Sequence, residues 1–107
     1  MKDLKQDGRV IVALGESTGH CHEVLAADAV SLPDAQYFEE PDGTRMLLIL
    51  APCLLTHQEH APIALSPDRQ EQVRQGDVLL QPCGPRAWRV VQQQEWAGPE
   101  AWRAVQD

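Results

Sequence analysis

All four histidines of the chain lie in two short segments. His20 and His22 belong to the first segment, G-E-S-T-G-H-C-H-E-V, and His57 and His60 belong to the second, T-H-Q-E-H-A-P. Imidazole nitrogens bind zinc, iron, nickel and copper, and three such ligands around one ion leave a further position for water or substrate. The two pairs therefore predict a divalent transition-metal site, provided that the fold brings the segments together.

The spacing within each pair suits a shared ion. Residues two apart on a strand point to the same face, so His20 and His22 share a face and Cys21 points away from it. Residues three apart, such as His57 and His60, share one side of a helical turn. All four imidazoles are therefore candidate metal ligands, in one site or in two.

A catalytic role for such a site would involve a metal-activated water or a metal-bound small molecule. Glu16, Glu23 and Glu59 are the carboxylates near enough in sequence to carry protons for it. Glu23 faces away from His22 in a regular strand and would need a β-bulge to take part. No residue pattern identifies a substrate or a reaction, so it stays open whether the protein is an enzyme.

The net charge of the chain argues against some binding partners, and two functions other than metal binding remain open. The net charge is −7, from 16 acidic and 9 basic residues. This excess argues against nucleic acid and anionic membranes, because phosphate binding needs clustered lysine and arginine. One alternative is a non-catalytic acidic protein-interaction module with structural or exposed histidines, and another is a metal-free barrel that binds a small molecule. Exposed strand edges would also permit a homodimer.

Length and composition are those of a small globular protein. The 107 residues fit a single β-barrel-like domain over residues 1–107. No apolar run approaches the ~20 residues that cross a bilayer, and the first residues lack the apolar core of a signal peptide, so we expect a cytoplasmic protein. Cys21, Cys53 and Cys83 are too few and too widely spaced for a disulfide framework. The surroundings of Cys53 and Cys83 are apolar, and we expect both in the core.

Short apolar runs separated by turn residues predict the elements that position the histidines. Turn signals stand at residues 41–43, 66–68 and 75–77. Residues 98–105 open with Gly98-Pro99-Glu100 and predict a short helix. Strands are expected at residues 9–14, 20–25, 35–40, 44–51, 53–55, 63–65, 78–80 and 86–96. The predicted fold is all-β, a small barrel or jelly-roll-like sandwich with a short C-terminal helix.

Two glycine-led motifs carry a family resemblance. In G-E-S-T-G-H-C-H, four residues separate Gly15 from the H-x-H pair, and residues 76–84 read G-D-V-L-L-Q-P-C-G. These resemble the two motifs of the cupins, small jelly-roll barrels that often hold one metal ion. The resemblance implies that His20 and His22 are ligands. The pair T-G-H-C-H and H-Q-E-H-A-P-I also resembles small bacterial proteins without an assigned activity.

The chain departs from the cupin pattern at three places. The cupin glycine is followed by five residues before H-x-H, whereas here it is followed by four. Ala26 and Ala27 stand where the cupin glutamate is expected, and Ala87 stands where the histidine of the second motif is expected. His57 and His60 have no counterpart in the pattern, so their assignment as ligands rests on their chemistry and spacing alone.

Overall fold

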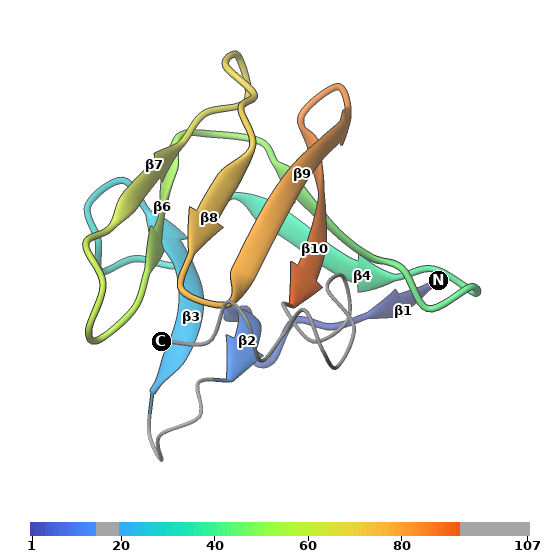
Figure 1. Cartoon of the computed structure of the whole chain (residues 1–107), viewed down its shortest axis with the longest axis horizontal. Helices are drawn as coiled ribbons and strands as arrows, with labels where there is room; N and C mark the ends of the chain where they lie inside the picture. The colour runs from blue at the N-terminus through green and yellow to red at the C-terminus, as the bar shows by residue number, and fades with distance from the viewer. Residues whose placement is uncertain (15–19, 93–107) are drawn as a thin grey trace, which may run out of the picture.

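The computed structural model describes residues 1–14 and 20–92, and every described element is a β-strand (Figure 1). The predicted helix at 98–105 lies outside the described residues. The strands are β1 (Lys2–Asp3), β2 (Val10–Leu14), β3 (Cys21–Ala26), β4 (Ala35–Glu39), β5 (Arg45–Ile49), β6 (Cys53–Thr56), β7 (Ile63–Leu65), β8 (Val73–Gln75), β9 (Val78–Gly84) and β10 (Ala87–Gln92).

The strands form two antiparallel sheets, which confirms the predicted all-β fold. The larger sheet has the order β1-β4-β5-β10-β9-β8, and the smaller has the order β2-β3-β6-β7 (Figure 1). All the strand pairs are antiparallel, as expected for strands joined by short turns. The chain moves between the sheets four times along its length, so segments distant in sequence meet where the sheets face each other.

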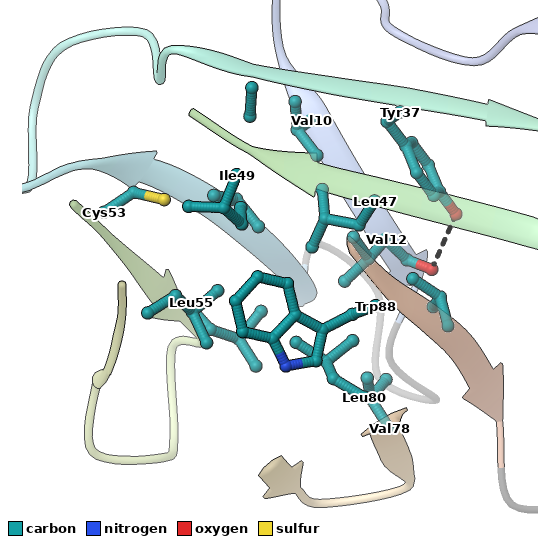
Figure 2. Packing of buried hydrophobic residues seen from close by; sticks show 14 of the residues in the cluster. Val10, Val12, Tyr37, Leu47, Ile49, Cys53, Leu55, Val78, Leu80 and Trp88 are labelled. Atoms are coloured by element: carbon teal, nitrogen blue, oxygen red, sulfur yellow. Dashed lines mark hydrogen bonds between the residues drawn. The ribbon is translucent and has the colours of Figure 1, made fainter. Parts of the chain in front are cut away.

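The core lies between the sheets and takes side chains from both. Trp88 is 1% exposed, and Figure 2 shows its ring among Leu47, Leu55 and Leu80. The Tyr37 hydroxyl donates to the backbone carbonyl of Val12 at 3.3 Å, joining β4 to β2. Each fully buried large apolar side chain stabilises the fold by about 1.5–3 kcal/mol. This core holds the two sheets in a fixed relation, and that relation positions the histidines.

Several elements differ in detail from the sequence-based expectation. β5 ends at Ile49 rather than continuing to residue 51, and β10 is described to Gln92, with residues 93–96 outside the described part. Cys53 is 2% exposed, as expected of a core thiol. The core assignment of Cys83 is wrong, because this residue lies in the exposed end of β9 and only the first part of that strand is buried.

A turn capped by an aspartate leads from β3 toward β4. The Asp28 carboxylate accepts hydrogen bonds from the backbone N–H groups of Val30 and Ser31 and from the Ser31 hydroxyl. These bonds, first of all the one from the hydroxyl, lower the pKa of Asp28 to about 2. Side-chain bonding of this kind lets the chain reverse without a helical turn.

Within the described residues, no helix is long and apolar enough to cross a membrane.

Candidate functional site: a histidine cluster

The two histidine segments meet at one end of the sandwich. Ring centroids lie 4.4 Å apart for His22 and His57, 4.6 Å for His57 and His60, 5.7 Å for His20 and His57, and 6.2 Å for His22 and His60. His57 therefore contacts the other three rings. We call these four residues the histidine cluster. The condition set by the sequence, that the fold must bring both pairs together, is met.

The pairing of β3 with β6 explains this convergence. Glu23 lies opposite Thr56 in the register, so the next position along the two strands brings His22 beside His57. The alternation of β3 turns His22 and Val24 inward, where they are 1% and 0% exposed. Glu23 points to the other face and pairs with Arg9 at 2.9 Å. Glu23 would need a β-bulge to reach the histidines, and the pairing of β3 with β6 is regular, so Glu23 faces away as expected.

His22 has a hydrogen-bond partner at each ring nitrogen. Its Nδ1 lies 2.9 Å from Gln75 Oε1, and its Nε2 lies 3.2 Å from Asp77 Oδ1. The Gln75 amide nitrogen donates to the carbonyls of Leu55 at 3.1 Å and Ala61 at 3.0 Å. These two bonds fix the amide so that its oxygen faces His22, and the proton of that contact therefore sits on His22 Nδ1.

Gln75 and Asp77 lie on either side of Gly76, which begins the tight turn between β8 and β9. Gly76 has φ +58°, a conformation that glycine adopts without the steric cost other residues bear. A Cβ at this position would lie 2.9 Å from His60 Nε2 and 3.4 Å from His22 Cε1. Glycine at position 76 therefore permits both the backbone conformation of the turn and its close contact with His60 and His22.

The surroundings of His57 favour the neutral form of its imidazole. Burial lowers the pKa of His57, and the neighbouring His22, His60 and His20 lower it further, while Glu59 acts in the opposite direction. Its Nδ1 accepts a hydrogen bond from the backbone N–H of Glu59 at 3.0 Å. Neutral imidazole is the form that binds metal ions.

The solvent side of the histidine cluster consists of His20, Glu59 and His60. His20 Nδ1 lies 2.9 Å from Glu59 Oε1, with side chains 29% and 63% exposed, and His60 is exposed. The Gln58 side chain accepts from the backbone N–H of Cys21 at 2.8 Å and ties this loop to β3. Of the carboxylates expected to carry protons, Glu59 is thus at the cluster, and Glu16 lies outside the described residues.

Among residues 1–14 and 20–92, no group of three or more histidine, cysteine, aspartate or glutamate side chains is arranged to hold a metal ion. Nδ1 of His57 is engaged by a backbone N–H, and Nδ1 of His20 faces a carboxylate. Coordination through Nδ1 would require these contacts to break, whereas coordination through Nε2 would not.

The four histidines that the sequence predicts as ligands lie together, but the sequence did not predict their contacts with Gln75 and Asp77. Both lie more than 50 positions from His22, at separations of 53 and 55. They stand beside a glycine in a turn, where glutamine and aspartate are ordinary residues. Only the strand order of the larger sheet, which places β8 at its edge, brings them to the histidine cluster.

No curated protein and no solved structure matches the chain. The model of one family, described as a domain of unknown function (DUF8820), matches residues 2–68. The matched segment contains β1 to β7 and the whole histidine cluster, and it ends before Gln75 and Asp77. Because the match spans more than half of the 107 residues, the chain belongs to the DUF8820 family.

Proposed function

We propose that this protein binds a divalent transition metal ion, such as zinc, iron, nickel or copper, through the histidine cluster. The supporting observation is the set of ring-centroid separations, which run from 4.4 to 6.2 Å. Two imidazoles bound to one tetrahedral zinc ion have centroids about 5 Å apart, given Zn–N bonds of about 2.0–2.1 Å. The ring centroids are thus spaced as those of ligands to one ion would be, although the side chains do not already stand in the arrangement of a formed metal site.

Binding would combine one fixed ring with rings that can turn. His22 is 1% exposed and is held at both nitrogens, whereas His20, His57 and His60 reach solvent. The exposed rings can exchange a weak contact for a metal bond at small cost, because surface ion pairs contribute about 0–1 kcal/mol. The nearby carboxylates of Asp77 and Glu59 favour a cation electrostatically.

The proposal is for binding, and it leaves the reaction open. Glu59 is the carboxylate to test first if the metal activates water, since it contacts His20 at 2.9 Å. The likeness of G-E-S-T-G-H-C-H to the first cupin motif supports the same two ligands, His20 and His22. If the protein is instead an acidic protein-interaction module or a metal-free barrel that binds a small molecule, the purified protein should contain only background levels of metal.

Metal analysis of protein purified without a histidine tag tests the proposal. We expect about one equivalent of a transition metal, or a rise in melting temperature when zinc, nickel, copper or iron(II) is added. His22→Ala and His57→Ala should each lower affinity, whereas Cys21→Ser should not, because Cys21 alternates to the other face of β3. Less than about a tenth of an equivalent together with no thermal shift would refute metal binding.

The same variants report whether one site or two exist. If His20→Ala weakens binding and His57→Ala does not, the proposed single site is wrong and the two pairs act separately. Melting curves of each variant in a chelator separate a loss of ligands from a loss of fold.

A further inference from the structure

We infer that the β8–β9 turn completes the histidine site, with Asp77 as an oxygen ligand beside His22 Nε2 and Gln75 as a positioning residue for the His22 ring. The inference rests on the proposed metal binding and goes beyond it by naming the donor set. It changes the expected site from four imidazoles to a mixed set of imidazole nitrogens and a carboxylate.

Gln75 determines which nitrogen of His22 is free to coordinate. This residue is 3% exposed, and its amide nitrogen donates to the carbonyls of Leu55 and Ala61. Its oxygen is therefore the acceptor for His22 Nδ1–H at 2.9 Å. In metal sites, a histidine ligand commonly donates its second ring N–H to a carbonyl or carboxylate, which fixes the tautomer and the ring orientation. Gln75 supplies such a partner.

The other nitrogen of His22 faces Asp77 at a distance suited to shared coordination. His22 Nε2 lies 3.2 Å from Asp77 Oδ1, so a metal ion bound to this nitrogen in place of a proton would also reach the carboxylate. Two ligand atoms on one tetrahedral zinc ion lie about 3.3 Å apart, given metal–ligand distances of about 2.0–2.1 Å. The separation fits a pair of metal ligands.

A third nitrogen lies directly above the turn. His60 Nε2 is 2.9 Å from the position that a Cβ of residue 76 would occupy, and His22 Cε1 is 3.4 Å from the same point. The missing side chain of Gly76 thus lets His60 approach the His22–Asp77 pair. Two imidazoles and one carboxylate suit zinc or iron(II) and leave a position for water or a small molecule.

Isosteric variants measured on the whole protein test the inference. Asp77→Asn keeps the size of the side chain and removes its charge, and it should weaken zinc binding at least tenfold in calorimetry. Gln75→Leu removes the partner of His22 and should weaken zinc binding about 10–100-fold. Asp42→Asn is the matched control, because Asp42 lies in another hairpin turn, where it accepts from the backbone N–H of Thr44. It should bind zinc as the wild type does.

Spectroscopy separates coordination from a structural role. Cobalt(II) in place of zinc should give a visible spectrum that changes in Asp77→Asn. Imidazole ¹⁵N shifts should show His22 protonated at Nδ1 and metal-bound at Nε2 in the wild type, and this pattern should be lost in Gln75→Leu. If Gln75→Leu does not fold, Asp77→Asn decides the question.

Failure of this inference is distinct from failure of the proposed function. Wild-type protein that takes up no metal refutes metal binding itself. Wild-type protein that binds zinc while Asp77→Asn binds equally well, with an unchanged cobalt spectrum, overturns the role of Asp77. A lower melting temperature of Asp77→Asn in a chelator, with unchanged zinc affinity, would assign Asp77 to an ion pair with His22 instead.

Discussion

The residues of the histidine cluster differ in burial and in hydrogen bonding. His22 is buried and hydrogen-bonded at both ring nitrogens, whereas His20 and His57 are half-buried and His60 is exposed. His22 is already ordered by its contacts, so it would lose less side-chain entropy on binding a metal ion than the more exposed histidines would. His22 is therefore the residue whose loss should affect binding most.

The pKa of His57 predicts how stability changes with pH in a chelator. Because this pKa is lower in the folded protein than the ordinary 6.5, the unfolded chain binds more protons as the pH falls below 6.5. The stability that neutral His57 contributes is then lost progressively down to the folded pKa. We expect the melting temperature to fall between pH 7 and pH 5, and His57→Gln to flatten that fall. An equal slope in the variant would contradict this account.

Thiol reactivity provides a second prediction at the residue scale. Burial raises the pKa of Cys53 to about 11, and the residue is 2% exposed. Burial also raises the pKa of Cys83, but that residue is exposed. At pH 8, iodoacetamide should modify Cys83 slowly and leave Cys53 unmodified until the protein unfolds, as mass spectrometry would show. Modification of Cys53 in the folded protein at the rate of Cys83 would show that the core there is open.

The sequence predicted the strands and the turn that build the site, but it did not predict the contact between them. The strand runs at 20–25 and 53–55 and the turn at 75–77 were predicted from alternation and from glycine, and each matches an element of the structure to within a few residues. The contact between the turn and β3 was not predictable, because it depends on which strand lies at the edge of the larger sheet. Local patterns specify elements, whereas the order of strands in a sheet depends on packing across the whole core.

Substitution of Gly76 tests the β8–β9 turn. Gly76→Ala should lower the free energy of unfolding by about 1–2 kcal/mol for the positive φ, and its new Cβ, which would lie 2.9 Å from His60 Nε2, should push the exposed His60 ring aside at little further cost. Gly43→Ala is the matched control, since Gly43 has φ +91° and nothing lies within 4 Å of the point where its Cβ would stand. Urea unfolding should show losses of similar size in both variants, and calorimetry should show weaker zinc binding in Gly76→Ala only. Zinc binding by Gly76→Ala as tight as by Gly43→Ala would contradict the approach of His60 to the turn.

The whole molecule is a sandwich whose core holds the two halves of the site in register. His22 comes from the smaller sheet, and Gln75 comes from the edge of the larger one. The sequence alone could not predict that all four histidines lie together, because no local pattern links residues 20–22 to residues 57–60. The pairing of β3 with β6 meets that condition, and the same packing brings in the two partners that the sequence did not indicate.

Core packing predicts a stability effect at this scale. Leu47 is 0% exposed, and Leu47→Ala should lower the free energy of unfolding by about 2–5 kcal/mol through lost burial and the cavity left behind. Leu50, which is 37% exposed, is the matched control, and Leu50→Ala should change stability by about 0.5 kcal/mol or less. Chemical denaturation of the two variants measures the difference, and similar losses would contradict the assignment of Leu47 to the core.

The central claim is that the histidine cluster holds a metal ion, and a crystal structure with zinc, phased at the zinc absorption edge, tests it most directly. We expect one anomalous peak about 2.1 Å from His22 Nε2, with His60 and Asp77 in its coordination sphere. Absence of a peak at the histidine cluster, or a peak bound only by residues outside it, would contradict the claim.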